Sequence, residues 1–413
     1  MSGEKPSTRA AEDEKSGSFM PNRREFLKLA GVAGGAGLLA GSAAADPEGS
    51  QLTERDLPAE GDRPTIRVVG TGGTIASSQE AAEDGGYSLA NQAEAIVAAV
   101  PELEYFVNVD FVQVAQKGSS SLLVEDYVAV AKEAMRAEAD GVDGVIVTHG
   151  TDAIEEDAFF NDLVLDLDIP VAFVGAMRPS DATSADGPAN LLTAVRMLTR
   201  TEFHLDDEPC GVYVVLNDTI HAARDVTKTW TTKVETFESG PAGPIGYFTD
   251  NELVLYREPG SYSANLSHCD LDAVPDMTVP IVTHGAGAES YTLEQAVAGD
   301  YHVDGAVVLA TGFGGGVSPA ITEATEAALE AGIPVARSTR VHWAPLNPGY
   351  DDDRTGDIVV MEDLPAWKAR LHVMVALTMT GSYPGLSSDL EVVRKTMEDN
   401  KYGIAVPAPS TLG

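Results

Sequence analysis

Two threonine-bearing segments each follow a short apolar run of strand length. Thr71-Gly72-Gly73-Thr74 follows the run at 66–70, and His149-Gly150-Thr151-Asp152 follows the run at 144–148. In an open α/β sheet, ligands bind at the carboxyl ends of the strands, which is where these hydroxyls would lie. Threonine hydroxyls at such an edge, with a lysine supplied from elsewhere in the chain, indicate covalent catalysis by a hydroxyl.

Thr74 is the stronger candidate nucleophile, because the two glycines before it let the backbone turn sharply and approach a ligand. The neighbouring amides form a candidate oxyanion hole for attack on an amide carbonyl. A loop that only holds an anion is the alternative, although the glycine spacing fits neither the dinucleotide fingerprint nor a P-loop. Tyr87 lies in a polar, glycine-rich segment that is a candidate lid; it would supply a phenol near Thr74, or be an ordinary exposed loop tyrosine.

Thr151 and Asp152 open a predicted helix with an acidic first turn. A simple helix N-cap explains either residue equally well, and it is the position at a strand end that favours a site. Lys228 follows the apolar run at 212–216 and is expected to reach the loops that contain 175–180 and 184–190. If its amine lies near Thr151, it can take part in moving the hydroxyl proton.

The elements that must position these residues alternate between strands and helices from Thr65 onward. This pattern predicts an α/β protein with two domains: a larger N-terminal domain at 63–255, on a parallel sheet covered on both faces, and a smaller C-terminal α/β domain at 279–413, joined by a linker at 256–278. The expected strands lie at 66–70, 109–115, 144–148, 171–175, 212–216, 279–283, 305–310 and 333–337. The expected helices lie at 89–99, 122–139, 152–166, 187–200, 291–298, 319–331, 368–379 and 388–400.

The chain is strongly acidic along its whole length. It has 413 residues, enough for two packed cores, and its 64 acidic residues against 27 Lys and Arg give a net charge of −37. Such a hydrated surface is typical of a protein from a halophilic organism, where salt screens the repulsion; binding of cations or of a basic partner is the alternative. No basic stripe is present to neutralise phosphates, so we expect no nucleic acid partner.

Residues 1–62 are predicted to be a targeting and spacer region. The twin arginine Arg23-Arg24, the mildly apolar run at 29–40 and the small residues at 43–45 are typical of a Tat export signal. The run is too short for a comfortable membrane span. We therefore expect an exported protein, extracellular or at the cell surface, without a stable membrane span; an amphipathic N-terminal helix on a cytosolic protein is the alternative.

Cys210 and Cys269 are the only cysteines. Two are too few for a cysteine zinc site or an iron–sulfur cluster. The sequence leaves open whether they are free or form a disulfide.

Five motifs together resemble the bacterial-type (type II-like) L-asparaginase/glutaminase family, and the composition resembles that of a haloarchaeal member. They follow the family's order, and the resemblance runs from about residue 65 to about residue 400. The motifs are Thr71-Gly72-Gly73-Thr74-Ile75-Ala76, His149-Gly150-Thr151-Asp152, Gly175-Ala176-Met177-Arg178-Pro179-Ser180, Ser184-Ala185-Asp186-Gly187-Pro188 and Arg224-Asp225-Val226-Thr227-Lys228-Thr229.

The resemblance implies hydrolysis of L-asparagine to L-aspartate and ammonia, without a metal or cofactor, by a homotetramer built as a dimer of dimers. Each active site would lie between the first domain of one subunit and the second domain of its neighbour. Thr74 would be the nucleophile that forms the acyl-enzyme, assisted by Tyr87. Thr151, Asp152 and Lys228 would form a second cluster, in which Asp152 binds the substrate ammonium and Lys228 tunes the Thr151 hydroxyl.

Ser119 matches the serine that holds the substrate α-carboxylate in that family, but Ser120 stands where many periplasmic members have glutamine. The family's second domain also offers a glutamate and an asparagine to the neighbouring site, and neither has a clear counterpart here. The acidic run at 351–353 is a candidate for the glutamate or is simply a solvated surface. These departures bear on substrate preference more than on the reaction.

Four alternatives remain at the level of the sequence. One is a glutaminase-asparaginase that accepts both amides, since the two substrates differ by one methylene. Another is the related subunit of the archaeal Glu-tRNA amidotransferase, although residues 1–62 hold no β-rich module. A third is a non-catalytic amino-acid-binding protein on the same fold. The fourth is a self-cleaving enzyme that exposes Thr74 or Thr151 at a new N-terminus. Thr74 lies too early in the chain and Thr151 falls inside the α/β alternation, so we predict no cleavage.

Overall fold

The computed structural model describes residues 63–72, 100–206, 208–249, 252–287, 290–299, 301–312, 316–343, 358–379 and 389–398. Within these ranges the chain forms one eight-stranded sheet, one four-stranded sheet and a two-stranded ribbon. The expected helix at 89–99, Thr74, Tyr87 and the predicted signal region at 1–62 lie outside the described residues.

The larger, N-terminal sheet has the strand order β10-β9-β6-β5-β4-β3-β1-β2. The five strands from β5 to β2 are parallel, as expected, and the β-branched runs of β1, β3, β4 and β5 are buried in the centre of the domain, whereas β2 is a partly buried edge strand. The strands are β1 (Thr65–Gly70), β2 (Asn108–Gln113), β3 (Gly144–Thr148), β4 (Val171–Val174), β5 (Val212–Leu216), β6 (Thr219–Ala222), β9 (Gly246–Thr249) and β10 (Glu252–Leu255).

The predicted parallel sheet of the N-terminal domain extends further than expected, because β6, β9 and β10 continue its parallel strands in antiparallel pairs. The chain reverses between β5 and β6 at Asn217 and Asp218, whose φ angles are 51° and 58°. Positive φ at both central residues is the conformation of a tight two-residue hairpin, and Asn and Asp tolerate it better than most residues. The sheet is therefore mixed.

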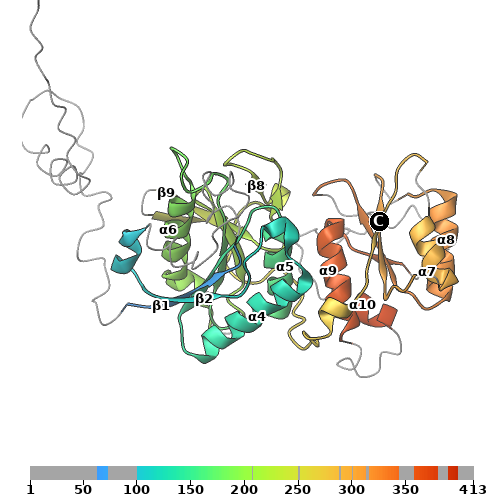
Figure 1. Ribbon diagram of the computed structural model, residues 1–413, viewed down its shortest axis with the longest axis horizontal. Coiled ribbons are helices and arrows are strands. Elements are labelled where there is room, and N and C mark those ends of the chain that lie inside the picture. The colour runs from blue at the N-terminus through green and yellow to red at the C-terminus, as the bar shows by residue number, and fades with distance from the viewer. Residues whose placement is uncertain are drawn as a thin grey trace, which may run out of the picture. The chain divides into compact units, whose positions relative to one another are not determined.

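Helices cover both faces of this sheet (Figure 1). Helices α4 (Val124–Ala139) and α5 (Ile154–Val164) share one apolar cluster with it, and α6 (Gly187–Leu198) and η2 (Pro101–Tyr105) belong to the cluster on the other face. Shorter elements complete the domain and its connection: η3 (Ser119–Ser121), η4 (Thr201–Phe203), β7 (Thr227–Lys228), β8 (Phe237–Glu238), η5 (Gly240–Ala242) and η6 (Val274–Asp276).

The smaller, C-terminal sheet is parallel throughout, in the order β11-β12-β13-β14. Helices α7 (Tyr291–Ala298) and α8 (Pro319–Glu330) pack on one face, and α9 (Ala366–Leu377) and α10 (Asp389–Glu398) pack on the other (Figure 1). The strands are β11 (Ile281–Thr283), β12 (Ala306–Ala310), β13 (Val335–Thr339) and β14 (Val359–Val360). This domain follows the expected strand–helix alternation.

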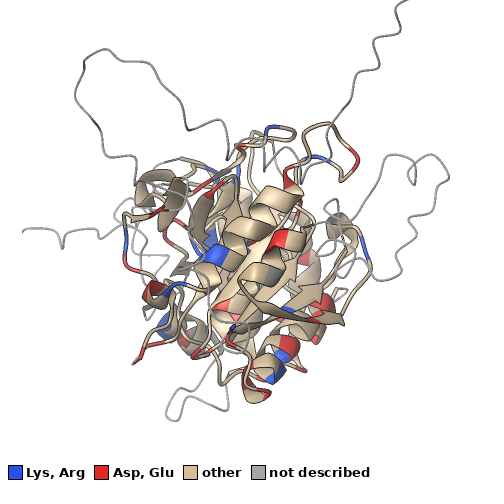
Figure 2. Ribbon diagram, turned by 90° about the vertical axis from the view of Figure 1, so that its left-hand side faces the viewer, with Lys and Arg blue, Asp and Glu red and all other residues tan. Residues whose placement is uncertain are grey.

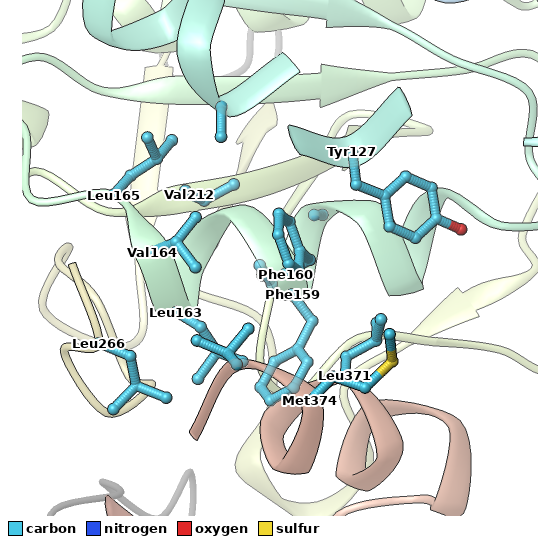
Figure 3. Close-up of a cluster of buried hydrophobic side chains, with 14 of the residues drawn as sticks. Tyr127, Phe159, Phe160, Leu163, Val164, Leu165, Val212, Leu266, Leu371 and Met374 are labelled. Carbon is cyan, nitrogen blue, oxygen red and sulfur yellow. The ribbon is translucent and has the colours of Figure 1, made fainter. Parts of the chain in front are cut away.

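Helix α9 is apolar around most of its circumference, which is typical of a helix that is buried on more than one side. One side packs on β12 and β13, and another packs on α5 of the N-terminal domain. In Figure 3, Phe159 and Leu163 of α5 point toward Leu371 and Met374 of α9. The core is therefore continuous from one domain to the other.

Both cysteines are free thiols. Cys210 is buried and donates to the carbonyl of Asp168. In the described part of the chain, no helix combines the length and the apolar character that a membrane span requires.

Asp162 on α5 is a fully buried carboxyl whose charge costs stability. It accepts the backbone N–H of Val212 at 3.3 Å and the hydroxyl of Ser263 at 2.5 Å, and burial raises its pKa from 3.8 to about 6. Because the folded pKa is the higher one, folding holds the proton more tightly, and this stabilising contribution is lost as the pH rises from about 4 to above 6.

Asp162→Asn should remove this pH dependence, since the amide oxygen still accepts from Val212 and its NH₂ can donate to Ser263. Between pH 4 and pH 7 the stability of the variant relative to the parent should rise by roughly 2–3 kcal/mol, the equivalent of a shift of about two pKa units. Urea unfolding at fixed molar salt and several pH values measures the difference. A constant difference across that range would contradict the assignment.

Candidate active site

The carboxyl ends of β1, β3 and β4 meet at one edge of the N-terminal sheet. The parallel register pairs Gly70 with Thr148, and Thr148 with Val174. Just beyond β1, both the backbone N–H and the hydroxyl of Thr71 donate to the carbonyl of Thr148, at 3.1 and 3.0 Å. The chain then turns at Gly72, whose φ is +106° and whose Cα faces the backbone of Lys117. Thr71 and Gly72 thus leave the sheet beside the carboxyl end of β3.

Three of the predicted site residues lie in contact at this edge. The ammonium of Lys228 donates to Oγ1 of Thr151 at 3.0 Å and to Oδ1 of Asp152 at 2.7 Å. Thr151 is buried, whereas the Asp152 side chain is 66% exposed and the Lys228 side chain is 15% exposed. The carboxylate partly neutralises the ammonium, and the open side of Asp152 leaves room for a cationic group of a ligand.

Ser119 belongs to the same cluster. It lies on η3, is buried, and accepts the backbone N–H of Asp152 at 3.2 Å. The structure therefore brings together four of the six candidate residues that were predicted from the sequence, namely Ser119, Thr151, Asp152 and Lys228. The positions of Thr74 and Tyr87, and of the acidic run at 351–353, lie outside the described residues.

A buried polar pair fixes the peptide that precedes Thr151. Nδ1 of His149 lies 2.7 Å from the carbonyl oxygen of Gly150, which can only accept, so this nitrogen carries a proton. Nε2 lies 3.0 Å from Oδ2 of Asp157, and Asn161 donates to the other carboxyl oxygen at 2.7 Å. Burial raises the pKa of Asp157, while the contacts with His149 and Asn161 act the other way. The arrangement holds the His149-Gly150 turn rigidly under the site.

Glu155 is a site residue for which the sequence offered only a general signal, the acidic first turn of the helix. Its Oε2 accepts the backbone N–H of Lys228 at 3.1 Å, and the residue is buried. The carboxylate therefore positions the main chain of Lys228 rather than touching a ligand.

The loop after β4 supports Thr151 from behind. The carboxylate of Asp186 accepts the backbone N–H groups of Met177 and Arg178, and Asn190 donates to the carbonyl of Gly175 at 3.0 Å. These bonds hold Gly175 against Thr151. The long loop at 175–190, which was predicted to serve a site, therefore packs against Thr151 and holds it in place.

Gly175→Ala should displace Thr151, because a Cβ at this position would lie 2.9 Å from Cγ2 of Thr151 and 3.1 Å from the carbonyl oxygen of His149. We expect kcat/KM to fall about 10- to 100-fold, the cost of moving a catalytic group by a fraction of an ångström to an ångström. Gly285→Ala, where a Cβ meets nothing within 4 Å, is the matched control. Steady-state kinetics that leave both variants at the parental value would exclude this role for Gly175.

Comparison with known proteins gives a consistent result for both domains. Residues 65–261 match the family described as Asparaginase, N-terminal, and residues 278–386 match the family described as Glutaminase/Asparaginase C-terminal domain. L-asparaginase 2 of Escherichia coli (strain K12) is 36% identical over 320 residues, which cover 77% of this chain and 90% of that protein. Glutaminase-asparaginase of Pseudomonas fluorescens biotype A is 35% identical over 322 residues, which cover 76% of this chain and 86% of that protein.

A solved structure shares the fold. The crystal structure of a probable cytoplasmic L-asparaginase from Campylobacter jejuni superposes with a TM-score of 0.69 at 30% sequence identity, covering 82% of this chain and 100% of that one. The matched families span both domains, and the threonine–lysine cluster lies within the N-terminal match. The chain therefore belongs to the asparaginase family.

Proposed function

We propose that this enzyme hydrolyses L-asparagine to L-aspartate and ammonia through a threonine acyl-enzyme. The hydroxyl oxygen of Thr74 attacks the side-chain amide carbon, its proton passes to the leaving nitrogen, and the C–N bond breaks to release ammonia. Water then adds to the resulting ester, the C–O bond to Thr74 breaks, and aspartate leaves. No step requires a metal or a redox cofactor.

The observation that carries this proposal is the contact of Lys228 with both Thr151 and Asp152 beside Ser119. In this scheme Asp152 binds the ammonium of the substrate, and Ser119 binds its α-carboxylate. Lys228 polarises the Thr151 hydroxyl, and Tyr87 assists Thr74. A site that only binds an amino acid has no need of a lysine held against a buried threonine hydroxyl, so the arrangement favours catalysis over a binding protein.

A glutaminase-asparaginase is the second candidate function. It is favoured by the relatives, because proteins named L-asparaginase 2 and proteins named glutaminase-asparaginase match this chain to nearly the same extent. The two substrates differ by one methylene, for which a pocket discriminates by about 1–3 kcal/mol. The ratio of the two rates distinguishes the candidates.

We also propose that the protein is adapted to high salt, as a haloarchaeal enzyme would be. The net charge of −37 supports this, and Figure 2 shows acidic positions spread over several helices and loops rather than gathered in one patch. Salt screens the repulsion among such charges. The adaptation predicts a higher unfolding temperature in molar KCl than in dilute KCl, and an equal temperature in both would count against it.

Export and assembly complete the proposal. The twin arginine at 23–24 and the small residues at 43–45 support export by the Tat pathway to the cell surface or beyond. The family resemblance supports a homotetramer in which a neighbour's second domain completes each site. N-terminal sequencing of the secreted protein tests the first point, and light scattering in molar salt tests the second.

The decisive experiment is to purify the chain in molar KCl and measure ammonia release from L-asparagine and from L-glutamine. Release from asparagine, with glutamine slower, is the expected result. Comparable rates would establish the second candidate. No release from either amide by a folded protein would overturn both.

A further inference from the structure

Lys368 is a fully buried lysine in the C-terminal domain whose ammonium points into the N-terminal domain. It lies in the first turn of α9 and is 1% exposed. Its Nζ donates to the carbonyls of Ala223, Arg224 and Val226 at 2.8, 2.9 and 2.6 Å. A lysine ammonium has three N–H donors, and these three carbonyls use all of them.

The three carbonyls belong to one turn, residues 223–226, between β6 and β7. Within the turn, the N–H groups of Asp225 and Val226 both donate to the carbonyl of Ala222, so the chain reverses tightly. The reversal directs the carbonyl oxygens to a common point in the interior. Buried carbonyls need donors, and only a compact group with several N–H bonds can satisfy three at one point. The turn can therefore keep this conformation only while the ammonium of Lys368 binds its carbonyl oxygens.

The same turn delivers Lys228 to the active site. Val226, whose carbonyl is bound by Lys368, precedes Lys228 by two residues. Lys228 in turn is held at its backbone N–H by Glu155 and at its ammonium by Thr151 and Asp152. A shift of the turn would therefore be transmitted directly to the contact between Lys228 and Thr151.

A second link comes from the segment just before α9. Asp363 forms a two-pronged ion pair with Arg224, at 2.6 and 3.3 Å. This pair fixes the side chain of Arg224, whereas the carbonyl oxygens of the turn are bound by Lys368. Asp363 is therefore a suitable comparison for Lys368, because it connects the same turn to the C-terminal domain without orienting the carbonyl groups.

Lys368 keeps its charge at neutral pH in spite of its burial. Desolvation lowers its pKa to about 8, against the favourable field of Glu155 and Asp225. The ammonium also lies 5.6 Å from the ring centroid of Phe159 on α5. The protonated form, which alone supplies three donors, is therefore the main form at pH 7.

We propose that Lys368 is a positioning residue for catalysis: by binding three carbonyls of the turn at 223–226, it holds Lys228 in reach of Thr151. The C-terminal domain then sets the geometry of the active site in its own chain. This inference rests on the role proposed above for Lys228 in asparagine hydrolysis.

The test is Lys368→Met in the full-length protein, in molar KCl, with Asp363→Asn as the comparison. Lys368→Met should lower kcat about 10- to 100-fold, as a displaced catalytic group does, with a smaller change in KM. Asp363→Asn should lower the unfolding temperature and leave kcat within a few-fold of the parent. If Lys368→Met is not recovered folded, Lys368→Gln, which retains two N–H donors, takes its place.

Chemical rescue separates positioning from stability. Lys368 lines a cavity of about 140 Å³ together with Arg224 and Val226, so Lys368→Ala opens a path for a small amine. Ethylammonium should restore part of the lost kcat, measured as aspartate formed, and tetramethylammonium, which has no N–H donor, should not. Restoration by both cations alike, or by neither, would overturn the proposal.

The outcome is separable from that of the proposed function. If the parent hydrolyses asparagine and Lys228→Met does not, the proposed function stands whatever Lys368 does. Parental kcat and KM in a folded Lys368 variant would then overturn the positioning role alone. An equal loss of kcat in Lys368→Met and Asp363→Asn, in step with their unfolding temperatures, would also overturn it.

Discussion

Replacing Thr74 with alanine should abolish ammonia release from L-asparagine while L-aspartate still binds. The substitution removes the oxygen that forms the acyl-enzyme, and the residual rate is expected to be at least about 10⁴-fold below that of the parent, because no second nucleophile completes the reaction. The ligand contacts proposed for Ser119 and Asp152 remain. Ammonia release and calorimetric titration with L-aspartate measure the two properties separately.

Thr71→Val is the matched control for Thr74→Ala. The Thr71 hydroxyl lies three residues earlier and donates to the carbonyl of Thr148, so its loss should cost about 1 kcal/mol of stability and leave the rate within a few-fold of the parent. Parental activity in Thr74→Ala would contradict the covalent scheme. The mass of the denatured chain identifies one reason for such a result: cleavage before Thr151 would point to the self-cleaving mechanism instead.

The central parallel strands of the N-terminal sheet, β1, β3, β4 and β5, could be predicted because they are buried on both faces. The continuous β-branched runs at 66–70 and 144–148 mark β1 and β3 within one residue, and glycine or a polar residue marks the end of each. Since parallel strands end at one edge, the segments that directly follow β1 and β3 begin side by side, as the bonds from Thr71 to Thr148 show. This is why the contact between Thr151 and a lysine could be anticipated from strand ends and family motifs.

The antiparallel half could not be predicted in the same way. β6, β9 and β10 have four residues each, and the hairpin turn between β5 and β6 uses Asn217 and Asp218 without a glycine. Only the backbone conformation distinguishes such a pair from an ordinary polar loop. The antiparallel pairing of these strands is fixed by that turn and by neighbouring strands, not by their own periodicity.

The role of Lys368 could not be predicted from the sequence, for a different reason. In the sequence it is one of two charged residues in a mostly apolar helix, 140 residues from Lys228. Its partners are backbone carbonyls, which carry no side-chain signature. A contact of this kind depends on the packing of α9 against α5 and on the turn at 223–226, and both exist only in the folded chain.

Lys228→Met should lower kcat/KM for L-asparagine about 10²- to 10⁴-fold, the range for loss of a group that assists proton transfer. Methionine keeps the length of the side chain and removes the donor that contacts Thr151 and Asp152. Because the Asp152 side chain is largely exposed, water replaces the lost contact, and the unfolding temperature should change little. The loss should therefore be a loss of rate in a protein that remains folded.

Lys132→Met is the control that separates this effect from the removal of a positive charge. Lys132 pairs with Asp272, whose side chain is 84% exposed, and it belongs to α4 rather than to the site. Both substitutions change the net charge from −37 to −38, so the effect of the net charge alone is the same in the two variants. A rate for Lys228→Met that stays within a few-fold of Lys132→Met would mean that the lysine only supports the fold around Thr151. Proton transfer would then have to be assigned to a group on the segment that carries Thr74 and Tyr87.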